Sequence, residues 1–291
     1  MNYIDLRSLI RETSNLDFTT ASNHLHSILF NISRTDVLSL IKEIGIIPED
    51  IEHDSSEEKL YAKVSDILFA KALKEMNFEV RVLRERSNCA DIIAQSRYHN
   101  YSLVGDAKSF RLSRTAKNAK DFKVESMSHW REDNDFSVLV CPYFQYPRNK
   151  SQIYRSALNG NVSLFSWEYL YIILSENIQE SEEVDLRELW NQSFNIMQQT
   201  NIANANNCFI QQQDINIREI IELTEEQFVN HFNDIKGSIV YRGNEEIRYY
   251  ESEISRIQQL NREDAIRELL ISMKLDSKIE TIRRFINQLQ R

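Results

Sequence analysis

The sequence contains few of the residues that form tight phosphate-binding loops. It has only five glycines and three prolines among 291 residues. Each glycine stands alone in the chain, at positions 45, 105, 160, 237 and 243. Neither a glycine-rich phosphate loop nor a dinucleotide-binding fingerprint can be built from isolated glycines. This scarcity excludes most enzymes that work with a nucleotide cofactor.

Cysteine is equally scarce. The three cysteines, Cys89, Cys141 and Cys208, are an odd number and far apart, which argues against a disulfide framework. No Cys-x-x-Cys pair or Cys/His cluster is present, so we expect no structural zinc site.

Long apolar runs are absent as well. No stretch approaches the ~20 consecutive apolar residues that span a bilayer. The first ten residues include an acidic side chain and do not resemble a signal peptide. We therefore expect a cytoplasmic protein with no membrane partner.

The formal net charge of −9 has the wrong sign for a protein that binds nucleic acid. Phosphate binding depends on local charge, however. Between Asp106 and Lys123 there are six basic and two acidic residues, a local balance of +4. This distribution predicts a basic cleft in an otherwise acidic molecule.

The apolar pattern predicts three regions: an N-terminal helical cap (1–54), a core that contains the sheet (55–180) and a helical C-terminal region (181–291). We find no motif with a chemical role in the cap. Within the C-terminal region, the segment 201–213 is rich in asparagine and glutamine and is predicted to be a flexible linker.

The core opens with a helix that Ser55 caps, and its apolar residues continue to Leu73. Strands are predicted at 78–83, 90–94, 101–107, 136–142 and 162–165, with a helix at about 121–132. Three consecutive strands indicate a meander, and the return through a helix indicates a parallel crossover. The predicted fold class is α/β (α+β), a mixed sheet flanked by helices.

Two carboxylates and an amine fall at the ends of neighbouring predicted strands. Asp91 begins one strand and Asp106 ends the next. Because adjacent strands lie about 4.8 Å apart, these two acids can share one hard cation such as Mg²⁺. The carbonyl of Ala107 offers a third ligand. A metal held there would polarise a phosphodiester and lower the pKa of a bound water.

Lys108 follows Asp106 by two residues and so points to the same face of a strand. Its ammonium can orient the attacking water and offset negative charge. Alternatively, a neutral Lys108 can act as the base. The sequence leaves both roles open.

The Asp-x-Lys pattern by itself is weak, because it recurs as Asp121-Phe122-Lys123. Spacing alone fits solvent-exposed strand-end carboxylates equally well. The apolar residues before Asp106 and the partner acid Asp91 strengthen the catalytic interpretation.

The segment that follows Lys108 is predicted to bind DNA. Its basic and polar side chains suit phosphates and base edges, although most charge runs are simply solvated surface. The candidates are Arg111, Ser113, Arg114, Lys117, Asn118, Lys120 and Lys123.

Three further acids are weaker candidates. Glu58 can reach a second metal, although helix capping is its ordinary role. Glu85 precedes the Asp91 strand, but its arginine neighbours favour a surface turn. Asp121 fits a helix start or a supporting position near the metal.

The longest of these motifs resembles the HindIII family of type II restriction endonucleases. The resemblance is carried by Val104–Asn118 and Lys120–Val124. Shorter matches are Trp130–Asp133, Phe144–Pro147, Lys150–Ile153, Leu164–Glu168 and Ser277–Thr281. It is densest between residues 58 and 168 and thin between 177 and 262.

The resemblance implies the PD-(D/E)xK nuclease fold. It implies a homodimer that cuts both strands of double-stranded DNA with Mg²⁺, for which Mn²⁺ substitutes, and leaves 5′-phosphate ends. The implied target is AAGCTT, with a cognate DNA methyltransferase as a functional but not a binding partner. Asp91, Asp106 and Lys108 fall on the motif positions, and Ala90 replaces the proline of the superfamily motif, which is not a ligand.

Other functions remain open at this stage. A structure-specific or repair nuclease of the same fold would cut without sequence preference. A DNA-binding protein without catalysis would bind but not cut. In a helical interaction protein, the basic run would be surface only.

Overall fold

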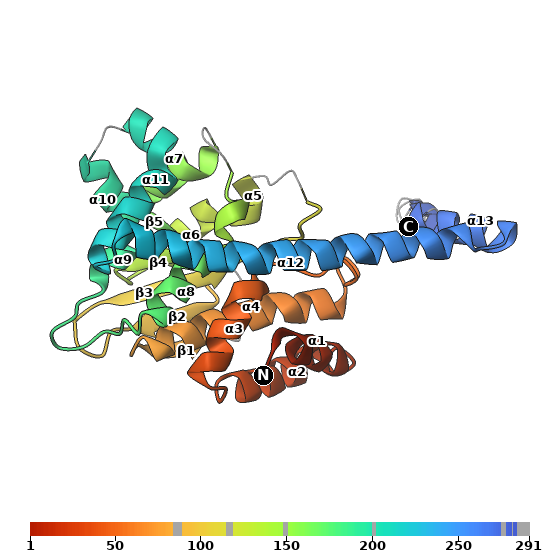
Figure 1. Ribbon diagram of the computed structural model, residues 1–291, viewed down its shortest axis with the longest axis horizontal. Coiled ribbons are helices and arrows are strands. Elements are labelled where there is room, and N and C mark those ends of the chain that lie inside the picture. The colour runs from red at the N-terminus through yellow and green to blue at the C-terminus, as the bar shows by residue number, and fades with distance from the viewer. Residues whose placement is uncertain are drawn as a thin grey trace, which may run out of the picture. The chain divides into compact units, whose positions relative to one another are not determined.

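The computed structural model describes residues 1–83, 89–114, 119–147, 151–199, 202–274, 278–280 and 282–283, with the side chains of 202–207 left out. The chain divides into two units, Met1–Gly243 and Asn244–Arg291. The sheet and every site described below belong to the first unit (Figure 1).

Three capped helices form the N-terminal region: α1 (Tyr3–Thr13), α2 (Phe18–Leu29) and α3 (Arg34–Ile44). Each begins at a polar side chain that accepts hydrogen bonds from the first turn: Asn2, Asp17 and Ser33. Gly45 follows the last residue of α3 as its C-cap.

Helix α4 (Ser56–Glu75) is the longest element of the core that precedes the sheet. The hydroxyl of Ser55 accepts a hydrogen bond from the amide of Glu58, which confirms the predicted cap. The helix is buried almost all round between Val64 and Leu73, because it packs between the sheet and the N-terminal helices.

The sheet has five strands in the order β1-β2-β3-β4-β5. Their bounds are β1 (Glu79–Val82), β2 (Ile92–Gln95), β3 (Ser102–Ala107), β4 (Phe136–Cys141) and β5 (Val162–Ser166). The first three are antiparallel, and β3, β4 and β5 are parallel. All five strands were predicted, and so was the meander followed by a parallel crossover.

Both faces of the sheet are covered. One face is covered by α4 and α8 (Trp167–Ser175), and α1–α3 pack in the same core behind α4. The other packs with α5 (Ala119–Phe122), α6 (Val124–Trp130), α7 (Gln152–Gly160), α10 (Gln192–Gln199) and α11 (Ile202–Ile220). A 3-10 turn (Tyr143–Gln145) follows β4, and α9 (Arg187–Trp190) precedes α10. The fold is therefore the predicted mixed α+β sheet flanked by helices.

Gly105 allows α4 to lie close to β3. A Cβ atom at this position would lie 2.5 Å from Cε1 of Phe69 on α4 and 2.8 Å from Cγ1 of Ile92 on β2. Any larger residue would push the helix away from the strand. The absence of a side chain at Gly105 thus sets the distance between α4 and the end of β3.

The predicted linker at 201–213 is wrong, because residues 202–213 belong to α11. Phe209, Gln213 and Ile217 recur every four residues and are at most 1% exposed. The side-chain amide of Gln213 donates to the carbonyl of Leu164 (2.8 Å), so this polar residue anchors the helix to β5. Composition suggested a linker, but burial of one helical face against the sheet decides the structure.

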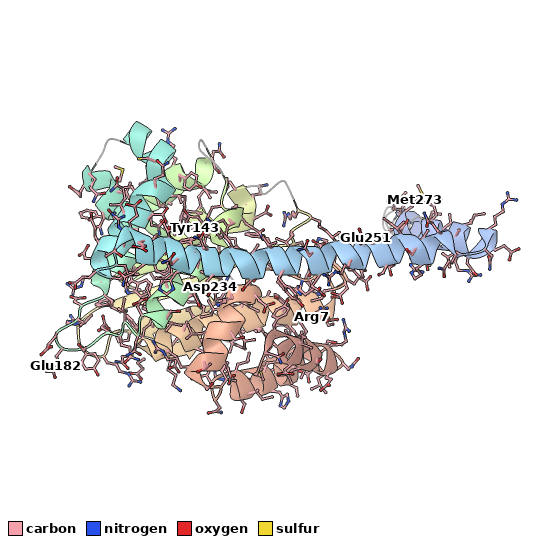
Figure 2. The ribbon with its side chains drawn as sticks, viewed as in Figure 1. Arg7, Tyr143, Glu182, Asp234, Glu251 and Met273 are labelled. Atoms are coloured by element: carbon pink, nitrogen blue, oxygen red, sulfur yellow. The ribbon has the colours of Figure 1, made fainter. Side chains whose placement is uncertain are left out.

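The second unit consists of the end of α12 (Glu225–Gln258), α13 (Arg262–Ser272) and the residues after it. Glu251 and Met273 mark these two helices in Figure 2. Asn261 caps α13, because its side chain accepts a hydrogen bond from the amide of Asp264. Of the described residues, none belongs to a helix that has both the length and the apolar character needed to cross a membrane.

Candidate active site

The backbone of the sheet places Asp91 and Asp106 side by side at the same end of the strands. The amide of Asp91 donates to the carbonyl of Gly105 (3.1 Å), and the amide of Leu83 donates to the carbonyl of Asp91 (2.8 Å). Asp106 pairs in register with Leu139 of β4. The two predicted acids are therefore fixed by strand pairing and do not depend on a free loop.

A third acid, Asp66 of α4, joins this pair, and the sequence did not single it out. Each of Asp66, Asp91 and Asp106 offers an oxygen atom, and these atoms lie within 4.8 Å of one another. Asp66 also accepts a hydrogen bond from the amide of Ala107 (3.3 Å). The only feature of the sequence that could have pointed to Asp66 is its position as an acidic residue inside the most apolar part of a predicted helix.

The three carboxyl groups do not ionise alike. Burial, together with the charges of Asp91 and Asp106, raises the pKa of Asp66 well above its ordinary value. Burial and the neighbouring Asp106 raise the pKa of Asp91 to about 7. Burial opposes ionisation of Asp106 too, but Lys108 beside it holds the pKa of Asp106 below its ordinary value. The metal-free cluster thus keeps one acid ionised and favours protons on the other two.

Lys108 forms an ion pair with Asp106. Its amide donates to the carbonyl of Val140 (2.7 Å) and its carbonyl accepts from the indole of Trp167 (3.0 Å), so the backbone is held on both sides. Burial alone would lower the pKa of Lys108, but the charge of Asp106 raises it above its ordinary value. Lys108 is therefore an ammonium in the metal-free protein.

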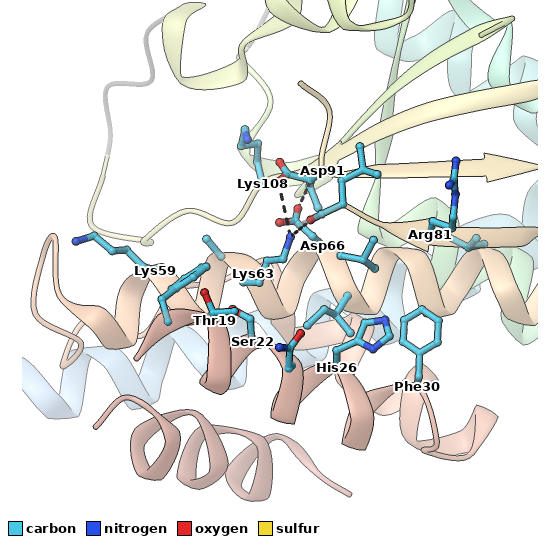
Figure 3. A pocket seen from close by; sticks show the side chains of 18 of the residues that line it. Thr19, Ser22, His26, Phe30, Lys59, Lys63, Asp66, Arg81, Asp91 and Lys108 are labelled. Atoms are coloured by element: carbon cyan, nitrogen blue, oxygen red, sulfur yellow. Dashed lines mark hydrogen bonds and ion pairs between the residues drawn. The ribbon is translucent and has the colours of Figure 1, made fainter. Parts of the chain in front are cut away.

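A second lysine, Lys63, faces the cluster from α4. Its ammonium lies 4.0 Å from Oδ1 of Asp91 and donates to the carbonyl of Leu83 (2.9 Å), as Figure 3 shows for the Asp91 contact. Lys63 precedes Asp66 by three residues, so both lie on one face of α4. Helix α4 thus places one acidic and one basic side chain, Asp66 and Lys63, at the ends of β1, β2 and β3.

The donor set fits a hard divalent cation. The Asp106 side chain is fully buried, and its partners among the described residues are the Lys108 ammonium and the Asp91 carboxyl group. A group of buried carboxylates is costly unless positive charge compensates it, and a bound cation would add to the charge of Lys108. Three carboxylates, with the predicted carbonyl of Ala107 beside them, are the oxygen ligands that Mg²⁺ prefers.

The predicted DNA-binding residues lie in different surroundings. Arg111 donates to Glu58 (2.6 Å) and to the carbonyl of Pro48 (2.7 Å), and Ser113 binds Glu49 through its amide (2.9 Å) and hydroxyl (2.8 Å). These contacts fasten the start of the basic segment to the loop before α4.

The later described residues of the segment lie on or beside α5. Arg114 pairs with Asp121 (2.7 Å), and Asp121 lies in α5 near the predicted helix start. Lys120 is exposed on α5, whereas Lys123 lies between α5 and α6 with a positive φ of 48° and lines the same cavity as Asp91. Lys117, Asn118 and Glu85 lie outside the described residues.

Glu58 belongs to a separate group. Its carboxylate accepts from the amide of Asp54 (2.8 Å), from Arg111 (2.6 Å) and interacts with His53 (3.0 Å). The structure therefore places it with the arginine and not with the three acids.

A mixed sheet with acids and a lysine gathered at the ends of two adjacent strands defines a nuclease of the PD-(D/E)xK type. Comparison with known proteins identifies the branch. A sequence model of the HindIII restriction endonuclease family matches residues 4–286. The chain is 41% identical over 281 residues to the type II restriction enzyme HindIII of Haemophilus influenzae, covering 97% of this chain and 94% of that protein.

The chain therefore belongs to the HindIII restriction endonuclease family. As a member of this family it is a DNA-binding hydrolase, a site-specific deoxyribonuclease. Type II restriction endonucleases typically need a divalent metal, and the carboxylates of Asp66, Asp91 and Asp106 could bind one.

Proposed function

We propose that the chain cuts both strands of double-stranded DNA at the palindrome AAGCTT with Mg²⁺ as its cofactor, leaving 5′-phosphate and 3′-hydroxyl ends. The observation that carries this proposal is the group of three carboxylates beside an ammonium at the strand ends, in a chain 41% identical to a type II restriction enzyme. The target and the ends follow from the resemblance to the family. Mn²⁺, which accepts the same oxygen ligands, is expected to substitute.

In this proposal, Asp91, Asp106 and Asp66 hold the metal, together with the carbonyl of Ala107. A bound Mg²⁺ supplies positive charge to the scissile phosphate and acidifies a water ligand. Lys108 orients the attacking water and offsets charge on the phosphate. We assign Lys108 this role and not that of a base because its pKa is raised by Asp106.

DNA binding is proposed to involve the segment from Arg111 to Lys123, whose charge opposes the overall −9. In the described part of this segment, Lys123 lines the cleft that contains Asp91, and Arg114 pairs with Asp121 of α5. Lys120, Lys117 and Asn118 complete the proposed contacts, and Arg111 and Ser113 fix the segment to the rest of the protein. The catalytic core is proposed to be 55–180, between the helical regions 1–54 and 181–291.

A homodimer is proposed because each chain carries one Asp/Asp/Lys set, whereas cleavage of both strands requires two. The second unit offers a surface for a second copy. Exposed apolar residues recur along α12 with spacings of three and four: Ile247, Tyr250, Ile254 and Ile257. On α13, Ile266, Leu269 and Leu270 are exposed, the two leucines three and four residues after Ile266, and Met273 follows as the exposed C-cap residue. This is the heptad pattern of helices that associate.

A cognate methyltransferase is expected as a functional partner only, and a cytoplasmic location as the site of action on DNA.

Plasmid digestion with Mg²⁺, followed by sequencing of the fragment ends, tests the proposal. Discrete bands ending at AAGCTT with 5′-phosphates support it, and Asp106→Ala and Lys108→Ala should each abolish cutting. A smear would indicate a structure-specific or repair nuclease instead. Tight binding without cleavage by the natural chain would indicate a DNA-binding protein without catalysis.

A further inference from the structure

A cavity of about 1130 Å³ begins at the catalytic acids and continues along α4 to α2 (Figure 3). Asp66, Asp91 and Lys108 line one part, and Thr19, Ser22 and Lys59 line another. Pockets for small molecules span roughly 300–1,000 Å³, so this cavity is larger than a single water or metal site requires. It joins the N-terminal helices to the active site.

The residues that line the cavity carry a net positive charge, although the net charge of the whole protein is negative. Five basic residues (Lys59, Lys63, Arg81, Lys108 and Lys123) and three acidic ones (Asp17, Asp66 and Asp91) line the cavity, a balance of +2 with histidine neutral. The whole chain has a charge of −9. Positive charge is thus concentrated where a phosphate chain would approach the acids.

The charged residues of α4 that line this cavity lie along one face of the helix. Lys59, Lys63 and Asp66 are separated by four and three residues, so their side chains leave one face of the helix. Lys59 is exposed, whereas Lys63 already contacts Asp91 and the carbonyl of Leu83. The two residues are separated by roughly 6 Å along the helix axis, Lys59 on the solvent side and Lys63 beside the acids.

The opposite wall comes from α2 and offers hydroxyl and amide groups. Oγ of Ser22 is buried and has no hydrogen-bond partner among the described residues. Thr19 is exposed one turn earlier, and Asn23 lines the cavity beside Ser22. Hydroxyl, amide and amine groups are the donors that proteins use on phosphate oxygens.

We propose that this arm of the cavity binds the sugar–phosphate backbone of the DNA strand next to the phosphate that is cut, with Lys59 and the polar face of α2 as contacts. The inference rests on the proposed nuclease function and extends it, because residues 1–54 showed no chemical role in the sequence. The N-terminal helices then contribute to substrate binding as well as to packing.

The test measures DNA binding as a function of salt, with Asp106→Asn as background to prevent cleavage. Each phosphate contact contributes about −0.9 to the slope of log K against log salt concentration. Lys59→Ala should weaken binding several-fold and make the slope shallower by about 0.9. Arg97→Ala removes one exposed positive charge from the turn between β2 and β3, and it should leave affinity and slope near those of the natural chain.

A second pair of variants tests the α2 wall. Thr19 and Thr20 are adjacent and both exposed, but only Thr19 lines the cavity. Thr19→Glu should weaken DNA binding at least tenfold, and Thr20→Glu, with the same change in charge, should weaken it much less. In the cleaving enzyme, Thr19→Glu should act mainly through a higher KM.

The inference would be overturned if Thr19→Glu and Thr20→Glu weakened DNA binding equally. It would also be overturned if Lys59→Ala left the slope of log K against log salt concentration unchanged. In either case, plasmid cleavage by the natural chain would still support the proposed function. Failure of the natural chain to bind or cut DNA would overturn both.

Discussion

The amide of Ala107, at the end of β3, donates a hydrogen bond of 3.3 Å to Oδ1 of Asp66 on α4. This contact connects a helix that precedes the sheet to the strand that carries Asp106. It also orients one oxygen of Asp66 toward the backbone, so that its carboxyl group lies with those of Asp91 and Asp106. The packing of α4 against β3 therefore holds Asp66 in the group of three acids.

Asp66→Asn should reduce Mg²⁺-dependent cleavage at least 100-fold. An amide of the same shape can still accept from Ala107, but it removes one negative charge from the proposed metal site. Metal titration by calorimetry, with DNA binding measured without metal, checks this. Metal affinity should fall while metal-free DNA binding is retained or improves. Full cleavage by Asp66→Asn would exclude Asp66 as a ligand.

Gly105→Ala should lower the free energy of unfolding by about 1–3 kcal/mol, because the added methyl group overlaps Phe69 and Ile92. Cleavage should fall as well, since displacement of α4 carries Asp66 away from Asp106. Denaturant unfolding and cleavage rates measure both effects. Adding Phe69→Leu should restore part of the loss, and the absence of any rescue would argue against a clash with α4.

Metal binding should strengthen as pH rises toward 8. The pKa of Asp91 is about 7 in the metal-free protein, and this proton must leave before the carboxylate can bind a cation. Asp66, whose pKa burial also raises, must lose a proton too, so Mg²⁺ affinity should fall by up to a hundredfold for each pH unit below 7. Calorimetry in buffers of different ionisation enthalpy counts the released protons, and Asp91→Asn should release fewer. A pH-independent affinity between 5.5 and 8 would contradict the assignment.

Glu168 should make the protein less stable at alkaline pH. It is buried at the start of α8, accepts from the amide of Tyr143 (2.8 Å), and burial raises its pKa to about 7 from 4.5. The folded state therefore binds more protons than the unfolded state between these values, so stability falls as pH rises through this window. The whole shift corresponds to on the order of 3 kcal/mol.

Glu168→Gln retains an oxygen for Tyr143 and removes the titration. Its stability relative to the natural chain should increase by that amount between about pH 4 and pH 8, measured by urea unfolding. A difference in stability that stays constant with pH would show that Glu168 does not titrate in this range.

Ile254→Glu and Leu269→Glu should each weaken self-association, because they place a charge in the proposed apolar contact of the second unit. Sedimentation equilibrium should show a shift toward monomer, and double-strand cutting should fall relative to nicking. Ser255→Glu adds the same charge one residue along the exposed helix. It serves as the control, and equal effects of all three variants would argue against this surface.

The order of helices and strands followed from the sequence because local patterns determine it. Apolar patterns marked the five strands, by alternation at 78–83 and by a continuous apolar run at 136–142, and Ser55 marked the start of α4. Asp91, Asp106 and Lys108 could be recognised because strand pairing keeps residues at neighbouring strand ends together. A local pattern was misleading only where polar composition hid one buried face, as in α11.

Only the tertiary structure brought Asp66 and Lys63 to the active site. Their approach depends on how closely α4 packs against β3, which Gly105 controls through a contact with Phe69 on the helix. The cavity between α2 and α4 depends likewise on the packing of helices from separate regions of the chain. Sequence periodicity specifies which face of a helix is buried, whereas the element that this face meets is decided by the packing of the whole domain.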